Sequence, residues 1–182
     1  MPELPEVEVT RRGLLSDLPG RLVTAVRCGR LRLRAPLPAA LLRAHIVGQR
    51  LTTIDRRAKY LLFRMESGAV LVAHLGMTGK FGVMTADAPL HKHDHLVLVL
   101  DNGLEVRYND SRRFGSIVVW PAGRARELEG EFSSREGIEP FGPQCTGRTL
   151  HRLAAGRSAP VKALLMNSRL VSGIGNIYAN EM

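Results

Sequence analysis

The feature of this sequence that most limits its fold is a series of short β-forming runs separated by turn residues. Between residues 21 and 120 these runs are RLVTAVRCGRLRL, RLTTIDRR, KYLLFRM, AVLVAHL, HLVLVLD, LEVRYND and SIVVW. The tripeptides ESG at 66–68 and DNG at 101–103 each lie between two runs, where hairpin connections belong. We therefore expect an antiparallel β-sandwich or barrel rather than a parallel sheet.

Helical patterns lie on both sides of this β-rich region. Pro5 suits the first position of a helix, and Val7, Leu14 and Leu18 share one helical face before a Pro-Gly pair. This pattern predicts a first helix over about residues 5–18. Near the other end, the segments RTLHRLAAG, APVKALLMNSRL and GNIYANEM predict further helices, with VSGIG as a tight turn before the last.

The switch from strands to helices divides the chain. The segment SSREGIEPFGPQCTG is rich in Ser, Gly and Pro and shows no periodicity, which predicts a linker at residues 133–147. We therefore expect an α+β protein, with a helix and a β-sandwich in residues 1–132 and an all-α part in residues 148–182. The last helical pattern has no stop signal before Met182, which leads us to expect a fragment or a truncated product.

The charge of the chain favours an anionic partner. Its 26 Lys and Arg residues against 17 Asp and Glu residues give a formal net charge of +9. Nucleic acid is the commonest such partner, because each neutralised phosphate releases counterions. A membrane surface is the alternative, but the basic residues are spread along the chain and no apolar run is long enough to span a bilayer. We expect no association with membranes.

The N-terminus and the cysteines limit the environment and the cofactors. Acids stand where a signal peptide has basic residues and an apolar stretch, so we expect a cytoplasmic protein. Cys28 and Cys145 are too few for a disulfide framework and lack the paired spacing of a zinc site. His91, His93 and His95 would share one strand face, but further ligands are not evident. We predict no metal or other cofactor in this chain.

The first residues carry chemistry of their own. Removal of a methionine that precedes proline leaves Pro2 with a free secondary amine, whose pKa lies near the α-amino value of about 8. Such an amine can attack a carbonyl-like carbon, and Glu3 places a general acid or base beside it. Taken alone, PELPE is also an ordinary helix-start sequence, with proline and acids in the first turn.

Several segments, in order along nearly the whole chain, resemble the bacterial formamidopyrimidine-DNA glycosylase family. They are MPELPEVE at the N-terminus, RRAKYLL at 56–62, HLGMTG at 74–79, KHDH at 92–95, SRRFG at 111–115 and GIGNIYANE at 173–181. The leucine of PELPE, with Met77, Arg112 and Phe114, favours this family over the related endonuclease VIII.

The resemblance implies a DNA repair enzyme of base excision repair. Such an enzyme removes oxidised purines, 8-oxoguanine and formamidopyrimidines, and cleaves the abasic strand by β,δ-elimination. It implies damaged double-stranded DNA as the partner, a monomer, and a place at the bacterial nucleoid. The alternatives are a DNA-binding fragment with impaired catalysis and a basic RNA-binding structural protein, although the latter explains neither the N-terminus nor SRRFG.

The resemblance also assigns the catalytic residues. Pro2 would attack C1′ of the damaged nucleotide to give a Schiff base, and Glu3 would handle protons at the opening sugar. Lys59 would contact a phosphate or move protons in the lyase step. Glu6 would support this arrangement, and the alternative for Glu6 is a solvated first-turn acid that favours the helix dipole.

Extruding a base leaves a hole in the stack that the protein must fill. In the family, residues that match Met77 and Phe114 wedge into the duplex, and the one that matches Arg112 bonds the orphaned base. Taken singly, each residue also has an ordinary explanation: Met77 could pack in the core, Phe114 could be an aromatic residue at a strand end, and Arg112 could be one of many phosphate contacts. Ser111 stands where family members commonly have proline, which frees a backbone torsion in this loop.

The remaining assignments concern the DNA backbone. The resemblance implies that His74 and His93 contact DNA. It also implies that the C-terminal part is a helix-two-turn-helix element, which is incomplete here. In that element Asn176 would contact phosphates, and Arg157 and Lys162 match basic positions near the lesion strand. Family members carry one Zn²⁺ in a four-cysteine zinc finger beyond the position of residue 182, and this sequence does not contain that finger.

Overall fold

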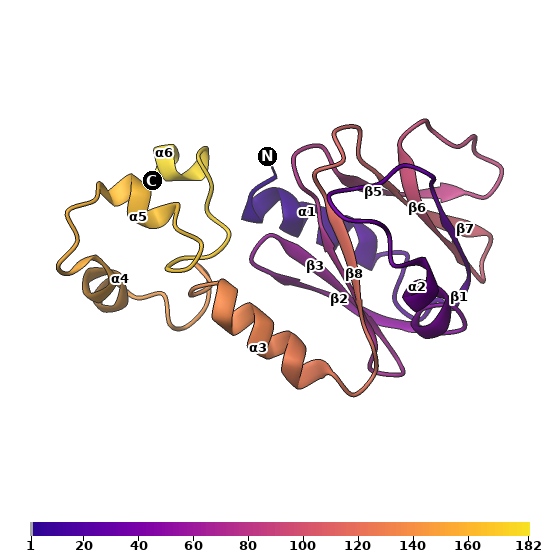
Figure 1. The fold of residues 1–182 in the computed structure, drawn as a ribbon, viewed down its shortest axis with the longest axis horizontal. Coiled ribbons are helices and arrows are strands. Elements are labelled where there is room, and N and C mark those ends of the chain that lie inside the picture. The colour runs from indigo at the N-terminus through magenta and orange to yellow at the C-terminus, as the bar shows by residue number, and fades with distance from the viewer. Residues whose placement is uncertain (1) are drawn as a thin grey trace.

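The computed structural model describes residues 2–182 (Figure 1). The helices are α1 (Leu4–Leu15), α2 (Ala39–His45), α3 (Ala125–Arg135), α4 (Gly147–Ala154), α5 (Val161–Leu165) and α6 (Tyr178–Glu181). The strands are β1 (Val23–Cys28), β2 (Leu51–Arg57), β3 (Tyr60–Met65), β4 (Val70–His74), β5 (Lys80–Thr85), β6 (Asp94–Leu100), β7 (Leu104–Asn109) and β8 (Ser116–Trp120).

The strands form two antiparallel sheets, so the expected α+β fold with an antiparallel sandwich is confirmed. One sheet has the order β1-β6-β7-β5 and the other the order β2-β3-β4-β8. The ESG and DNG turns connect β3 to β4 and β6 to β7, as predicted. The aromatic rings of Phe63, Phe81 and Tyr108 link the two sheets, with centroids 5.1 and 5.0 Å apart. These rings lie in the main apolar core.

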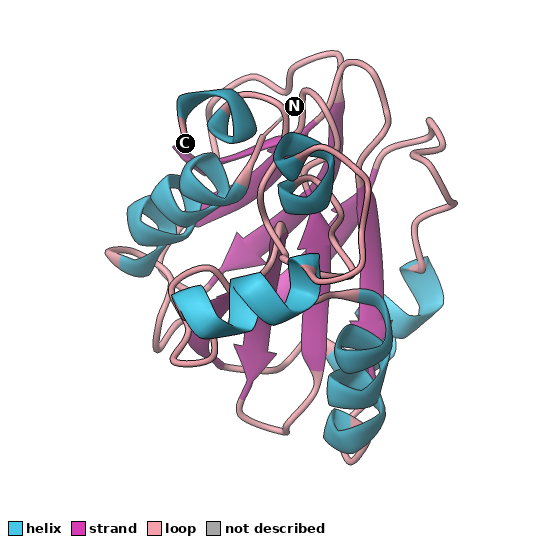
Figure 2. Ribbon diagram, turned by 90° about the vertical axis from the view of Figure 1, so that its left-hand side faces the viewer, coloured by secondary structure: helices cyan, strands magenta, loops and turns pink. Residues whose placement is uncertain are grey.

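Two further apolar clusters organise the rest of the chain. Leu128 and Phe132 of α3 pack on Leu62, Val70 and Val72, which lie on the outer face of the second sheet. The C-terminal segment has a small cluster of its own around Val171, Ile174 and Ala179. Figure 1 shows α4, α5 and α6 beside the sandwich, and Figure 2 shows these short helices and α3 in front of the strands.

Several elements differ from expectation. The first helix is Leu4–Leu15, the first β-run ends at Cys28, and α2, α3 and β5 were not predicted. The last turn of α3 overlaps the beginning of the linker expected at residues 133–147. The C-terminal helices are shorter than their patterns, since α5 ends at Leu165 and α6 spans Tyr178–Glu181.

The prediction that His91, His93 and His95 share one strand face is wrong. β6 begins at Asp94, so His91 and His93 precede it in a turn. The backbone N–H of His91 donates to Asp94 Oδ2 at 2.9 Å, which closes that turn. His95 is buried, with its Nε2 2.8 Å from the carbonyl oxygen of Asp110. Within residues 2–182 no helix is long and apolar enough to cross a membrane.

Candidate active site

The carboxylate of Glu3 joins the two ends of the chain. It is 2% exposed and accepts hydrogen bonds from the backbone N–H groups of Gly175 at 2.8 Å, Ile177 at 2.8 Å and Tyr178 at 3.2 Å. A Cβ at position 175 would lie 2.5 Å from Glu3 Cδ, so the close approach requires glycine. The backbone of residues 175–178 therefore binds a carboxylate that belongs to the protein itself.

Pro2 and Glu6 flank this carboxylate at the start of α1. Pro2 is half-buried and directly precedes Glu3, whose backbone N–H donates to Glu6 Oε2 at 2.9 Å. The exposed Glu6 also accepts a 3.3 Å hydrogen bond from the hydroxyl of Tyr178. Glu6 therefore caps α1, which directly follows Pro2 and Glu3, and ties it to the C-terminal segment.

Lys59 reaches the same place from the sheet. It lies in the turn between β2 and β3, and its Nζ donates to the carbonyl oxygen of Ile174 at 3.0 Å. Burial lowers the pKa of Lys59, while Glu3, Glu136 and Glu6 act in the opposite direction. Burial alone raises the pKa of Glu3, but the three backbone N–H groups and Lys59 together lower it below its ordinary value. At neutral pH, Glu3 is therefore a carboxylate.

A half-buried ion pair fixes the turn that carries Lys59. Ala58 has φ +51°, which is uncommon for a residue with a side chain, and its N–H donates to Glu139 Oε1. The guanidinium of Arg56 donates to Glu139 Oε2 at 2.8 Å and to the carbonyl oxygen of Ala58 at 3.0 Å. Sequence analysis missed Glu139, since it lies in the segment expected to be a linker.

The strand register gathers a second group of predicted residues at the same end of the sheet. Tyr60 pairs with His74, and His74 pairs with Ser116. The Lys59 turn, the loop after β4 and the loop before β8 therefore lie next to one another. These loops carry Met77 on one side and Arg112 and Phe114 on the other.

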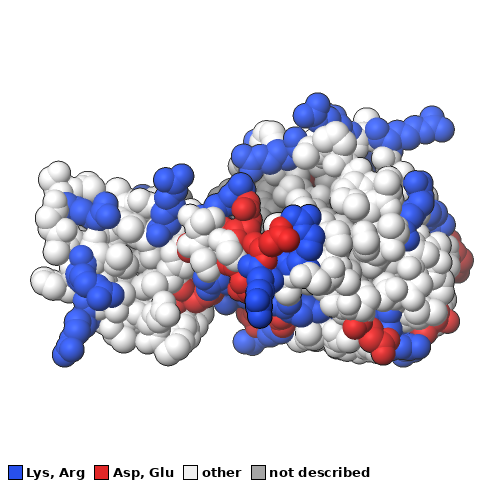
Figure 3. Space-filling view, turned by 60° about the horizontal axis from the view of Figure 1, so that its bottom comes forward, with Lys and Arg blue, Asp and Glu red and all other residues white. Residues whose placement is uncertain are grey.

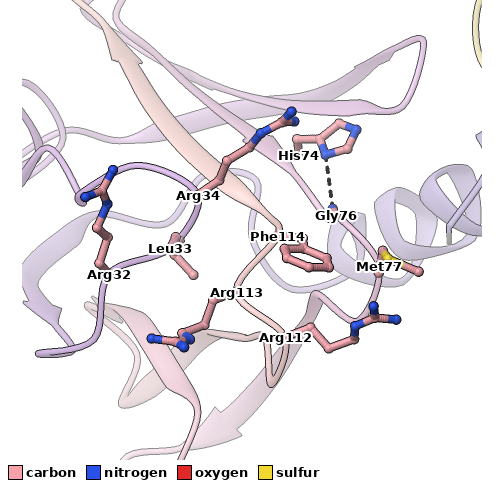
Figure 4. Close-up of a pocket in the computed structure, with 9 residues that line it drawn as sticks. All are labelled: Arg32, Leu33, Arg34, His74, Gly76, Met77, Arg112, Arg113 and Phe114. Atoms are coloured by element: carbon pink, nitrogen blue, oxygen red, sulfur yellow. Dashed lines mark hydrogen bonds between the residues drawn. The ribbon is translucent and has the colours of Figure 1, made fainter.

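Met77, Arg112 and Phe114 line a cavity of about 690 Å³ (Figure 4). Met77 is 37% exposed and Phe114 is 48% exposed, so both apolar side chains are accessible to solvent. The guanidinium carbon of Arg112 lies 5.0 Å from the centre of the Phe114 ring, within cation–π range. The remaining lining residues are Arg32, Leu33, Arg34, His74, Gly76 and Arg113.

His74 presents a neutral imidazole to this cavity. Its Nδ1 accepts the backbone N–H of Gly76 at 3.0 Å, as the dashed line in Figure 4 marks. Burial, with Arg34 and Lys59 nearby, lowers the pKa of His74 to about 4. Since Nδ1 accepts in the neutral ring, Nε2 carries the hydrogen and is a donor.

Comparison with known proteins identifies this arrangement. The family model described as the formamidopyrimidine-DNA glycosylase N-terminal domain matches residues 1–117. The chain belongs to this glycosylase family. The formamidopyrimidine-DNA glycosylases of Halorhodospira halophila and Stenotrophomonas maltophilia (strain R551-3) are each 47% identical to the whole chain, which spans 66% and 65% of their lengths. The chain thus spans slightly less than two thirds of these relatives.

Solved glycosylase structures share the fold. The Lactococcus lactis enzyme bound non-covalently to DNA containing an AP site is 30% identical, with a TM-score of 0.86 over 98% of this chain and 67% of that one. A complex of the same bacterium's enzyme with THF-DNA and an inhibitor is 31% identical, with a TM-score of 0.84 over 99% of this chain and 66% of that one.

Some residues that were expected to contact DNA lie away from the cavity lined by Met77, Arg112 and Phe114. Asn176 lies next to the amides that bind Glu3 and is exposed. Arg157 and Lys162 are exposed near α4 and α5, where Arg157 Nε donates to the carbonyl oxygen of Leu153 at 2.8 Å. His93 lies beside the start of β6, and its buried Nδ1 has no partner within residues 2–182.

Figure 3 shows acidic and basic side chains side by side in the middle of the molecule, between the C-terminal helices and the sandwich. On α1 and β2, Glu8 pairs with Arg11 and Arg12 at 2.8 Å and with Arg56 at 3.5 Å. These arginines are therefore compensated by an acid, whereas Arg112 forms no ion pair in the described part of the chain.

The zinc site expected in longer family members is not built by this part of the chain. Cys28 lies in β1 and Cys145 lies just before α4, and both are free thiols. Residues 2–182 contain no group of three or more His, Cys, Asp or Glu side chains that could hold a metal ion.

Proposed function

We propose that this protein excises oxidised purines from double-stranded DNA and then cleaves the strand at the abasic site. The observation that carries the proposal is the meeting of three distant parts of the sequence: the N-terminal pair Pro2 and Glu3, the turn residue Lys59, and the segment before α6. An amine, a carboxylate and a lysine at one buried junction are the groups that Schiff-base chemistry on a sugar needs. Membership of the glycosylase family supports the same reading.

The reaction begins at the nitrogen of Pro2. Its lone pair attacks C1′, and the N–C1′ bond forms as the bond to the base breaks. The bond's electron pair leaves with the base, which takes up a proton. The sugar ring then opens as O4′ leaves C1′ with a proton, which gives an iminium ion. Loss of a C2′ proton breaks the C3′–O3′ bond, and loss of a C4′ proton then breaks the C5′–O5′ bond.

Glu3 serves this sequence as a fixed carboxylate. Oε2 accepts two backbone hydrogen bonds and Oε1 accepts one, so Oε1 keeps a lone pair with which to accept a proton. Its negative charge also stabilises the cationic iminium, and this effect is strengthened because Glu3 is only 2% exposed. Lys59 carries an amine of lowered pKa at the same junction, suited to exchanging protons during elimination.

The exposed residues around the cavity open the duplex in this proposal. Met77 and Phe114 fill the space that the extruded base leaves, and Arg112 donates hydrogen bonds to the unpaired partner base. His74 donates from Nε2 to a phosphate. Residues 148–182 act as a helix-two-turn-helix element, in which Asn176, Arg157 and Lys162 meet the backbone, with His93 on the sandwich side. We expect the protein to work as a monomer at the nucleoid, in the cytoplasm.

The test is base release from a duplex that contains 8-oxoguanine opposite cytosine. Protein whose first residue is Pro2 should release the oxidised base and leave strand ends phosphorylated on both sides of the gap. Glu3→Gln and an undamaged duplex serve as controls and should give neither product. Binding to the damaged duplex without base release would instead support a DNA-binding protein with impaired catalysis.

A further inference from the structure

Asp110 is a buried carboxylate without a charged partner. It directly follows β7, is 0% exposed, and makes no ion pair in the described residues. A carboxylate in such a place is costly unless several hydrogen bonds compensate it. The donors that compensate Asp110 all come from the loops around the cavity or from β7.

These donors tie two loops to one side chain. Asp110 Oδ1 accepts from the hydroxyl of Thr78 at 2.6 Å, on the loop between β4 and β5. Asp110 Oδ2 accepts from the N–H of Gly115 at 2.8 Å, at the end of the loop before β8, and from the hydroxyl of Tyr108 at 3.3 Å. Burial and the neighbouring Asp110 raise the pKa of Tyr108, which therefore remains a donor.

Thr78 connects Asp110 to Arg112 by hydrogen bonds. Its hydroxyl donates to Asp110 and accepts the backbone N–H of Arg112 at 3.1 Å. The two loops also touch directly, since a Cβ at Gly76 would lie 2.4 Å from the nitrogen of Gly115. Met77 belongs to the first loop, and Arg112 and Phe114 belong to the second (Figure 4).

The second loop needs such support. Arg113 has φ +61°, a left-handed conformation that persists only when its surroundings hold it. Ser111 leaves the backbone of this loop freer than a proline would. The hydrogen bonds of Asp110 and Thr78 hold both sides of this stretch.

We propose that Asp110 is a positioning residue that sets Met77, Arg112 and Phe114 at fixed places relative to one another for insertion into a damaged duplex. The proposal rests on the proposed function of these three side chains. An amide at position 110 would turn an NH₂ group toward either Thr78 or Gly115, and one donor would lose its acceptor. An aspartate is therefore required at this position because both of its side-chain oxygens accept hydrogen bonds, which an amide of the same shape cannot match.

The experiment measures binding to three duplexes at one salt concentration: a tetrahydrofuran abasic analogue opposite cytosine, the same analogue opposite adenine, and undamaged DNA. Asp110→Asn and Thr78→Val should each lose roughly tenfold in preference for the analogue over undamaged DNA, and most of the preference between opposite bases. Affinity for undamaged DNA should change less than twofold, because phosphate contacts supply it.

Two matched variants separate positioning from general stability. Thr78→Ser keeps the hydroxyl and should keep the preference of the original protein. Glu105→Gln changes another buried carboxylate, in β7, whose partners are Arg27 and Arg107. It should lower the unfolding temperature and leave both preferences unchanged.

Amide hydrogen exchange at Arg112 and Gly115 keeps the test independent of catalysis. Exchange at both amides should be roughly tenfold faster in Asp110→Asn. Folded Asp110→Asn and Thr78→Val proteins with unchanged preferences would overturn the proposal. If the original protein shows no preference for the analogue, the proposed function is contradicted instead. In that case, unchanged amide hydrogen exchange in Asp110→Asn would also refute the role of Asp110.

Discussion

The carboxylate of Glu3 accepts a 2.8 Å hydrogen bond from the backbone N–H of Gly175, which is 172 positions away in the chain. This bond and its neighbours place the N-terminal residues Pro2 and Glu3, the turn residue Lys59 and the C-terminal segment at one point. The relationship predicts that the C-terminal segment shapes the reaction centre as much as the sandwich does.

Gly175→Ala should disable the centre without unfolding the protein. The added Cβ would lie 2.5 Å from Cδ and Oε1 of Glu3, so the carboxyl group would have to shift away from the amides that bind it. We expect a loss of at least about tenfold in single-turnover base release, with affinity for undamaged DNA unchanged. Gly147→Ala is the control, since a Cβ there meets nothing within 4 Å. Equal loss in both variants would contradict the role given to Gly175.

The pKa of Glu3 predicts an acid-dependent stability. Because the pKa is lower in the folded state than the ordinary 4.5, the stabilisation is fully present above about pH 4.5 and is lost as pH falls through the folded value. Glu3→Gln should therefore be less stable than the original protein at pH 7, and the difference should shrink below pH 4.5. Denaturant unfolding of both proteins between pH 3 and 7 measures it. A difference that stays constant with pH would refute the charged state of Glu3.

His74 should titrate far from its ordinary value. Its pKa of about 4 means that the ring stays neutral in the folded protein through pH 5 to 7. The unfolded chain takes up a proton below about pH 6.5, so His74 lowers stability progressively as pH falls from 6.5 to 4. An NMR titration, with His74→Gln to assign the ring signals, should give a midpoint near 4. A midpoint near 6.5 would mean that the ring is solvated and charged below that pH.

Glu139→Gln should loosen the Lys59 turn. The substitution weakens the pairing with Arg56 and the acceptor for the Ala58 N–H, and we expect a loss of about 1–3 kcal/mol in unfolding free energy. The yield of β-elimination should fall further than affinity for the abasic duplex. Glu129→Gln is the control, because Glu129 is exposed and 3.9 Å from Arg64, and it should cost less than about 0.5 kcal/mol.

The sequence predicted the sandwich well because its signals are local. Alternating apolar residues and the ESG and DNG turns are read within a few positions, and both hairpins formed as expected. α3 escaped prediction because RELEGEFSSR contains Gly and Ser and buries only Leu128 and Phe132, so packing on the sheet overrides its weak propensity. Gly82 similarly obscured β5.

The residues of the candidate site also divide into those that local motifs indicate and those that only the structure reveals. Motifs pointed to Pro2, Glu3, Lys59, Met77, Arg112 and Phe114, each within a short recognisable segment. Asp110 and Glu139 were missed because their importance lies in contacts with residues far away, such as Thr78 and Arg56. A buried carboxylate cannot be told from a surface one in a single sequence without its partners.

The most direct test of the account is the site of covalent attachment. Borohydride reduction during incubation with an abasic duplex reduces the iminium carbon and should trap a complex whose adduct lies on the N-terminal peptide, at the nitrogen of Pro2. Pro2→Gly, which keeps a terminal amine, should still give some complex. Protein that retains Met1 should give none, because the Pro2 nitrogen is then an amide without a free lone pair. Equal trapping with Met1 retained, or an adduct on Lys59, would contradict the account.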